Sequence, residues 1–121
     1  MTYVEGFVVA VPTDKKDAYR KHAAEAAPMF QEFGAARMVE AWGDDVQHGK
    51  VTDFYRAVQA KEDETVVFSW VEWPSKEARD KGNAAVATDP RTMQAPEELN
   101  LMDPKRMIYG GFVPVVDEKG A

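Results

Sequence analysis

The residue types best suited to chemistry lie between positions 41 and 54, where the chain reads AWGDDVQHGKVTDF. This stretch holds two adjacent carboxylates, Asp44 and Asp45, and one of the two histidines, His48. Carboxylates and an imidazole can bind a divalent metal ion or act as acid and base near neutral pH. A metal site needs three or four converging ligands, and the other histidine, His22, lies at the edge of a predicted helix stripe. Because Asp and Gly are also typical turn residues, we expect a loop here and no metal.

Three glutamates in strand-like segments, Glu5, Glu40 and Glu72, are separate candidates for acid–base chemistry. A carboxylate among aromatic side chains loses hydration, which raises its pKa towards a useful value. Together with His48, these glutamates are our candidate catalytic residues. The alternative is that they lie at strand ends or form ion pairs. The arginines available for such pairs are Arg37, Arg56 and Arg106.

Four aromatic residues, Trp42, Phe68, Trp70 and Tyr109, are our candidate ligand-binding residues. They could form the walls of a pocket for an aromatic or apolar molecule. They could equally form the centre of a dimer interface, where aromatic residues are enriched.

These residues must be positioned by alternating strands and helices. Tyr19, Ala23, Ala26, Phe30 and Phe33 recur at the spacing of one helical face, and Gly34 suits the end of that helix. Strands are predicted where β-branched and aromatic residues cluster. The predicted elements are a strand over 3–11, a helix from 13 or 14 to 33, a strand over 36–43, an extended segment over 54–60, a strand over 65–73, a helix over 76–88, a helical turn within 96–102 and a strand over 107–116.

This order predicts an α+β, ferredoxin-like split βαβ domain, in which two helices cover one face of an antiparallel sheet. We expect a single domain over residues 1–121, with 116–121 as a flexible tail.

Alternate strand residues point to opposite faces of a sheet, so the pattern also predicts what each face carries. The helix-covered face is expected to hold Val4, Gly6, Val8, Val39, Ala41, Val67, Ser69, Val71, Ile108, Gly110 and Phe112. The open face is expected to hold Tyr3, Glu5, Phe7, Met38, Glu40, Trp42, Phe68, Trp70, Glu72, Met107 and Tyr109. Since an exposed apolar face of this kind marks an interface or a ligand cavity, we expect a homodimer formed through it.

Composition excludes other classes of function. The net charge of −6 repels phosphate backbones, which argues against a nucleic-acid partner. No apolar run approaches the length of a membrane span. The absence of cysteine and of a secretory signal pattern predicts a cytoplasmic protein.

Four segments also carry a resemblance to a known family. They are GDDVQHGKVT at 43–52, ETVVFSWVEWPSKEARD at 64–80, DPR at 89–91 and KRMIYGGF at 105–112. They resemble the YbaA-like family, a bacterial family of unknown function. The resemblance implies a subunit of the dimeric α+β barrel type and assigns no catalytic residue. The chain departs from the family pattern at Gln47-His48 and at Asp103-Pro104, and the first departure argues against a family-wide role for His48.

Two functional hypotheses follow. In the first, a homodimer binds a small apolar or aromatic molecule in a cavity on the non-helical sheet face, where cofactor-independent enzymatic chemistry could occur. In the second, the same face is filled by dimer contacts and the protein is a non-catalytic assembly or regulatory module. A metal-dependent enzyme centred on Asp44, Asp45 and His48 is a third, less favoured hypothesis.

Overall fold

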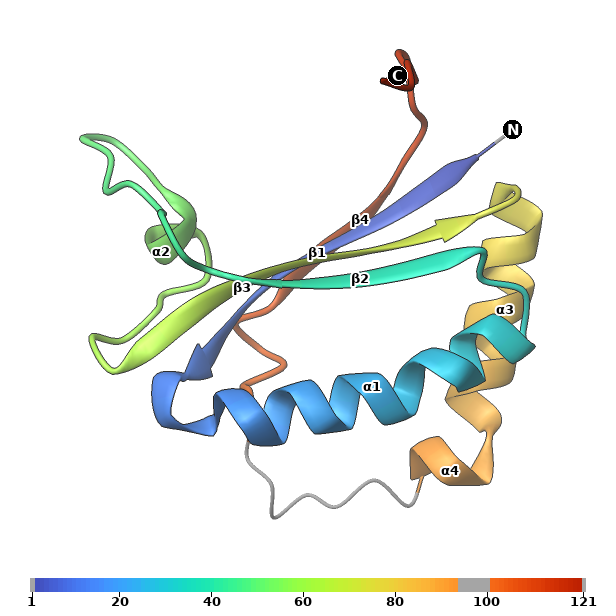
Figure 1. Cartoon of the computed structure of the whole chain (residues 1–121), viewed down its shortest axis with the longest axis horizontal. Helices are drawn as coiled ribbons and strands as arrows, with labels where there is room; N and C mark the ends of the chain where they lie inside the picture. Colours follow the sequence, from blue (N-terminus) through green and yellow to red (C-terminus); the bar gives the residue numbers. More distant parts are fainter. Residues whose placement is uncertain (1, 94–100, 121) are drawn as a thin grey trace.

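The computed structural model describes residues 2–93 and 101–120, which form one four-stranded antiparallel sheet with helices packed on it (Figure 1). The strands are β1 (Tyr3–Pro12), β2 (Arg37–Trp42), β3 (Glu64–Trp73) and β4 (Ile108–Phe112), in the spatial order β2-β3-β1-β4. The helices are the 3-10 turn η1 (Thr13–Lys15), α1 (Lys16–Glu32), α2 (Phe54–Ala57), α3 (Lys76–Thr88) and α4 (Pro90–Met93). The predicted ferredoxin-like α+β fold is confirmed.

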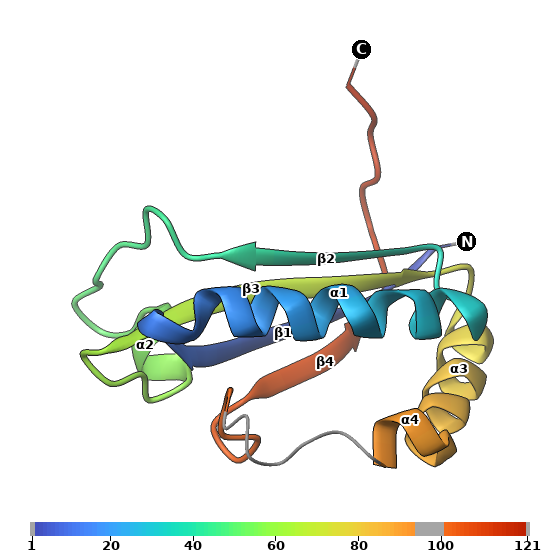
Figure 2. The ribbon, with the colours of Figure 1, turned by 60° about the horizontal axis from the view of Figure 1, so that its bottom comes forward.

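The two long helices, α1 and α3, lie on one side of the sheet, and the single-turn helix α2 lies on the other (Figures 1 and 2). We call these two sides the helix-covered face and the open face. None of the helices within the described part of the chain is long and apolar enough to cross a membrane.

The pairing of β1 with β3 decides which residues share a face. Ten residue pairs run from Tyr3 opposite Trp73 to Pro12 opposite Glu64. Phe7 therefore lies opposite Ser69, and directly opposed residues in an antiparallel pair point to the same side. Since Ser69 and its alternate neighbours face the helices, Phe7 faces them too.

The predicted faces were right for β3 and wrong for the other three strands. The helix-covered face carries Tyr3, Glu5, Phe7, Val9, Val11, Met38, Glu40, Trp42, Val67, Ser69, Val71, Trp73, Met107 and Tyr109. The open face carries Val4, Gly6, Val8, Val39, Ala41, Phe68, Trp70, Glu72, Ile108, Gly110 and Phe112. The physical reason is that β1 is apolar on both sides, so its pairing with β3, and not its own sequence pattern, decides which side chains face the helices.

The helix-covered core has two adjoining parts. One part contains Val9, Val11, Tyr19 and Val67, and the other is centred on Trp73, whose side chain is fully buried. Gly82 lets α3 lie against this tryptophan, because a Cβ atom there would come within 2.3 Å of the Trp73 ring. The helix continues through Gly82 because close packing against Trp73 stabilises it there.

The segment over 54–60 was predicted to be extended, but its first four residues form the helical turn α2. The side chain of Asp53 caps this turn by accepting a hydrogen bond of 2.8 Å from the backbone N–H of Arg56. Val58, which is fully buried, packs with Val8 and Val66 at one end of the open face. Capping and tertiary packing therefore override the β-propensity of this segment.

The last strand is shorter than predicted, ending at Phe112 instead of residue 116. Beyond it the chain leaves the sheet on the side away from α1 and α3 (Figure 1). Val113 and the valines at 115 and 116 are exposed in this extension. The helical turn predicted within 96–102 lies mostly outside the described residues.

An ion pair between Arg106 and Glu64 fixes the approach to β4. The guanidinium donates two hydrogen bonds to the carboxylate, of 2.7 and 2.8 Å, and a third of 2.9 Å to the carbonyl of Gln59. Hydrogen bonding to Arg106 lowers the pKa of Glu64 from 4.5 to about 2. Because the folded-state pKa is depressed, this stabilisation is present above about pH 4.5 and is lost as the pH falls towards 2.

We expect Glu64→Gln to lower the free energy of unfolding by about 1–2 kcal/mol at pH 7, because Arg106 loses its charged acceptor. Urea unfolding of variant and parent should converge as the pH approaches 2. Glu62→Gln, at an exposed position two residues earlier, is the matched control. A difference that stays constant from pH 7 to pH 3 would contradict this assignment.

Candidate functional site

Two adjoining hollows lie between α1 and the sheet, with volumes of about 340 and 190 Å³. Both are bordered by Tyr19, Ala23, Met38 and Glu40. The larger volume falls within the range of about 300–1,000 Å³ that is typical of small-molecule sites. The hollows exist because α1 presents alanine side chains where larger residues would fill the layer. Those alanines are Ala23, Ala24, Ala26 and Ala27.

A hydrogen-bonded tyrosine and glutamate lie where the two hollows meet. The phenol of Tyr19 donates to Oε1 of Glu40 across 2.6 Å, and the hydroxyl of Ser69 also bonds to this carboxylate. Tyr19 is buried, while Glu40 keeps contact with solvent through its position on edge strand β2. His22, on the next turn of α1, borders the smaller hollow.

The environment changes the acidity of both partners. Burial and the neighbouring Glu40 raise the pKa of Tyr19, so the phenol stays protonated and remains a donor. Burial raises the pKa of Glu40, whereas the hydrogen bonds from Tyr19 and Ser69 and the charge of His22 offset part of that rise. A carboxylate that is more basic than usual and lies beside a cavity can accept a proton from a bound molecule.

Most of the remaining walls of this site are apolar. Phe30, Met38 and Met107 border the smaller hollow, and Trp42 borders the larger. The ring of Trp42 packs on that of Tyr19, with 6.4 Å between the ring centres. The site therefore suits a mainly apolar molecule that presents one polar group to Glu40.

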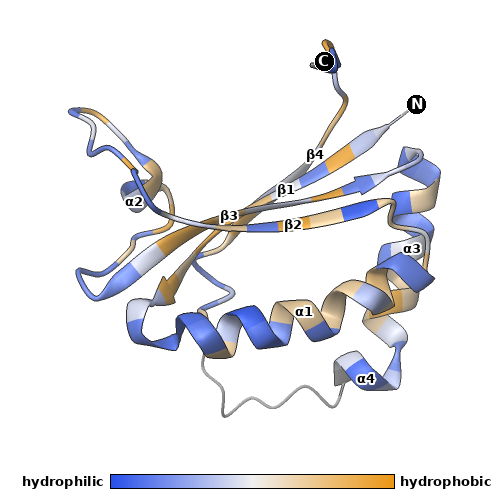
Figure 3. Cartoon of the chain, in the orientation of Figure 1, coloured by the Kyte–Doolittle hydropathy of each residue, from blue (hydrophilic) through white to orange (hydrophobic). Residues whose placement is uncertain are grey.

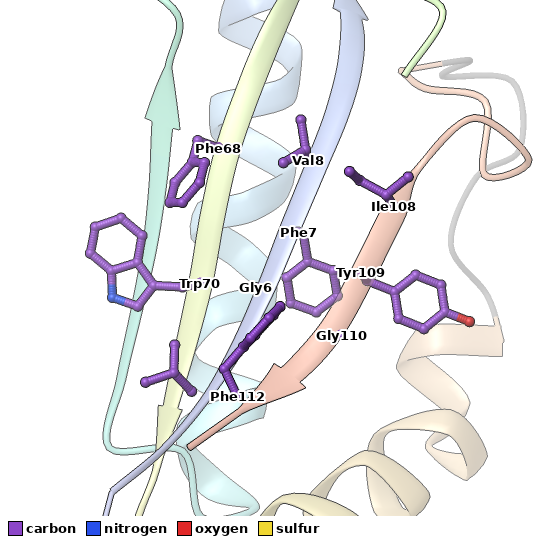
Figure 4. Close-up of a pocket in the computed structure, with 10 residues that line it drawn as sticks. Gly6, Phe7, Val8, Phe68, Trp70, Ile108, Tyr109, Gly110 and Phe112 are labelled. Atoms are coloured by element: carbon purple, nitrogen blue, oxygen red, sulfur yellow. The ribbon is translucent and has the colours of Figure 1, made fainter. Parts of the chain in front are cut away.

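The open face holds a different, larger hollow of about 620 Å³ (Figure 4). Its centre is formed by Val4, Val8, Phe68, Trp70, Ile108 and Phe112. Three of these side chains are strongly exposed, with 45% of Phe68, 46% of Ile108 and 60% of Phe112 accessible. Apolar residues dominate the central strands in the hydropathy colouring (Figure 3). An exposed apolar surface of this kind is typical of an interface.

Of the four predicted ligand-binding residues, Phe68 and Trp70 lie together on the open face, with 6.0 Å between their ring centres. Trp42 lies on the helix-covered face, so its predicted place on the open face was wrong. Tyr109 belongs to the helix-covered set as well, and it stacks on Phe7 at the β4 edge, where it only borders the open hollow. Figure 4 shows Tyr109 directed away from Phe68 and Trp70.

The three glutamates have different surroundings. Glu72 lies on the open face, accepts a hydrogen bond of 2.9 Å from Trp70 and pairs with Arg37 at 3.6 Å. This matches the structural alternative for Glu72, an arginine pair. Glu40 faces the hollows beneath α1 instead of the open face, because it lies opposite Ser69.

Glu5 is buried on the helix-covered face within a polar network of its own. Its carboxylate accepts hydrogen bonds from Asn83 at 2.8 Å, Arg79 at 3.3 Å and Trp73 at 3.4 Å. Arg79 also donates to the hydroxyl of Tyr3. The acceptor capacity of Glu5 is used by these residues, which makes it a structural link between β1 and α3.

The stretch from 43 to 53 is a loop, in which Nδ1 of His48 lies 3.9 Å from the carboxylate of Asp53. Asp45 accepts a hydrogen bond from Gln47, while the His48 ring stacks on Tyr55 with 4.2 Å between ring centres. The backbone N–H groups of Arg56 and Gly49 hold the pKa of Asp53 below its ordinary value. Within residues 2–93 and 101–120, no group of three or more His, Cys, Asp or Glu side chains is arranged to hold a metal ion.

Two residues of the tyrosine–glutamate site were not among the sequence candidates. Tyr19 was interpreted only as part of the apolar stripe of the first helix, and His22 as a residue at its edge. The sequence did contain a signal that these two residues act together, because Tyr19 and His22 are three positions apart and therefore lie on neighbouring turns of one helix face. The correct face for Glu40 would have placed both of them opposite this carboxylate.

The fold and the apolar open face define a ferredoxin-like α+β domain whose structural relatives include dimeric proteins. A dimeric ferredoxin-like protein from an uncultured marine organism matches 98% of this chain and 100% of its own, with a TM-score of 0.60 and 9% identity. A MhuD variant with two manganese protoporphyrin IX molecules per active site matches 98% and 99%, with a TM-score of 0.66 and 15% identity. SnoaB from Streptomyces nogalater, a cofactor-independent oxygenase, matches 96% and 95%, with a TM-score of 0.56 and 14% identity.

The chain belongs to the family described as protein of unknown function DUF1428, whose model matches residues 2–103. It is 61% identical over 118 residues to the uncharacterized protein YbaA of Escherichia coli, a match that covers 98% of this chain and 100% of that protein. YbaA of Shigella flexneri matches to the same extent. The resemblance identified from the four sequence segments is confirmed.

We expect Tyr19→Phe to raise the pKa of Glu40 further, because the carboxylate loses a donor that favours its charged form. NMR titration of the glutamate side-chain carboxyl carbons measures this shift. Tyr109→Phe, which removes a hydroxyl at the β4 edge, should leave the Glu40 titration unchanged. The assignment of the hydrogen bond is wrong if both variants titrate like the parent.

Proposed function

We propose that the protein is a homodimer in which each subunit binds a small, mainly apolar molecule beneath α1 and uses Glu40 as an acid–base group. The observation that carries this proposal is the Tyr19–Glu40 hydrogen bond of 2.6 Å beside a hollow of about 340 Å³. The pKa of both partners is raised, so Tyr19 stays a donor and Glu40 becomes a stronger base.

The open face supports the dimer. Its exposed side chains, including Phe68 and Phe112, form a continuous apolar surface with little competing polarity. The similarity to dimeric ferredoxin-like proteins supports the same arrangement by fold. Burying this surface against a second copy would stabilise the pair through the hydrophobic effect.

We expect Phe68→Glu to shift the protein from dimer to monomer in sedimentation velocity at micromolar concentration, because an uncompensated charge would be buried at the interface. The weakening should be at least tenfold in the dissociation constant, corresponding to about 1.4 kcal/mol. Gln31→Glu adds the same charge at an exposed position of α1 and should leave the dimer intact. A Phe68→Glu protein that still sediments as a dimer would place the interface elsewhere.

The chemistry proposed for the site is proton transfer without a bound cofactor. Glu40 would accept a proton from an acidic O–H or C–H group of the ligand, while Tyr19 and Ser69 hold the carboxylate in place. The apolar walls would keep water away from the group that loses the proton. Similarity to SnoaB, a cofactor-independent oxygenase, supports this type of reaction by fold only.

Our sequence hypothesis placed the ligand on the open face instead. That face has the larger hollow, but no described residue that borders this hollow carries a carboxylate, and Glu72 on the same face is already engaged by Trp70 and Arg37. We therefore favour the site beneath α1 for the ligand.

We retain the cytoplasm as the proposed location of the protein, because the chain has no cysteine.

A panel of one-ring and two-ring phenols, including 2-naphthol, tests the proposed site by thermal shift and calorimetry. We expect Ala23→Leu, which fills the hollow, to weaken binding at least tenfold, and Ala18→Leu, on the exposed side of the same helix, to leave it unchanged. Glu40→Gln should retain binding but abolish proton transfer. If Trp70→Ala removes binding while Ala23→Leu does not, the ligand lies on the open face. If no compound binds, the assembly module becomes the better hypothesis.

A further inference from the structure

We propose that the molecule bound beneath α1 is an aromatic or apolar carboxylate, whose anionic group is held by Lys16 and Arg20 at the outer rim of the larger hollow. This inference rests on the proposed function and adds the substrate class. The ligand is expected to have two distinct ends, with the carboxylate at the rim and an acidic proton at Glu40.

The two cations lie together at the larger hollow. Lys16 and Arg20 lie four residues apart on α1, so their side chains are neighbours on one face of the helix. Both border the larger hollow, and both are exposed, whereas Tyr19 is buried deeper in it. The two cations therefore form the solvent-facing rim of the hollow.

The lack of competing carboxylates carries the second step. Among the described residues that border the larger hollow, Glu40 is the only one with a carboxyl group. The ammonium of Lys16 instead lies 5.7 Å from the centre of the Trp42 ring. In a chain with 21 acidic and 15 basic residues, two neighbouring cations beside an apolar hollow form a local site for an anion.

The apolar residues of the larger hollow determine how such a ligand lies. Ala23, Met38 and Trp42 form apolar walls of the hollow that the two cations and Glu40 also border. An anion close to Glu40 would repel its carboxylate, so the ligand's charge is best held at the opposite end. A ring system along these walls separates the two charges and brings a hydroxyl or acidic C–H group to Glu40.

A matched pair of ligands tests this inference. The neutral probe is 2-naphthol, and the anionic probe is 6-hydroxy-2-naphthoate, which carries the same hydroxyl with a carboxylate at the far end of the rings. We expect the wild-type protein to bind the anionic probe about tenfold more tightly by calorimetry, because hydrogen bonds to a charged group are stronger than neutral ones. The preference should shrink at high salt because the rim is exposed.

Variants at the rim provide the decisive comparison. The double variant Lys16→Gln, Arg20→Gln should lose the roughly tenfold preference while its affinity for 2-naphthol stays unchanged. Lys21→Gln removes one positive charge from an exposed position of α1 that does not border the hollow, and it should keep the preference. All three positions are exposed, and circular dichroism verifies that the variants fold.

The outcomes separate the two proposals. If both probes bind equally, the anion inference is overturned and the proposed site beneath α1 stands. The same holds if Lys21→Gln reduces the preference for the anionic probe as much as the double variant Lys16→Gln, Arg20→Gln does. If neither probe binds wild-type protein, both proposals fall. Tighter binding of the naphthoate that depends on Lys16 and Arg20 supports the inference.

Discussion

The antiparallel pairing of β1 with β3 is the constraint on which the rest of the structure depends. It joins two ten-residue strands at the centre of the sheet, and each of them pairs with one edge strand. Because side chains alternate along a strand, this single register places Val9 and Val67 under the helices and Val8 and Phe68 on the open face. A shift of one residue would exchange the packed core with the exposed surface, so the fold, the proposed interface and the candidate site all depend on this register.

The sequence was sufficient for the architecture because hydrophobic periodicity reports element type. The main strands and both long helices followed from it, with small differences at their ends. It was insufficient for the faces, since β1 is apolar on both sides, with Tyr3, Phe7 and Val9 alternating with Val4 and Val8. Periodicity alone cannot orient such a strand, whereas its pairing with β3 can. The turn at α2 was missed because its stability comes from the Asp53 cap and from Val58 burial.

The candidate site could be predicted only in part. Glu40 was selected correctly as a carboxylate with a raised pKa, but its partners come from α1, which is remote in sequence. Glu5 has the same residue type and strand context, yet Arg79, Asn83 and Trp73 already use its oxygens. The side chains that surround each glutamate therefore decide whether it can serve as the proposed base. Which side chains these are depends on tertiary contacts and is not encoded in local sequence pattern.

The alanine-rich inner side of α1 has a consequence for how relatives of this protein can diversify. The volume beneath the helix is set by small side chains such as Ala23 and Ala27, which lie on the side of the sheet opposite to the exposed aromatic residues of β3. Replacing one of them by valine or leucine would reshape the chamber without disturbing the sheet register or the opposite surface. The ligand selectivity and the subunit association that we propose would therefore vary through separate residues of the same scaffold.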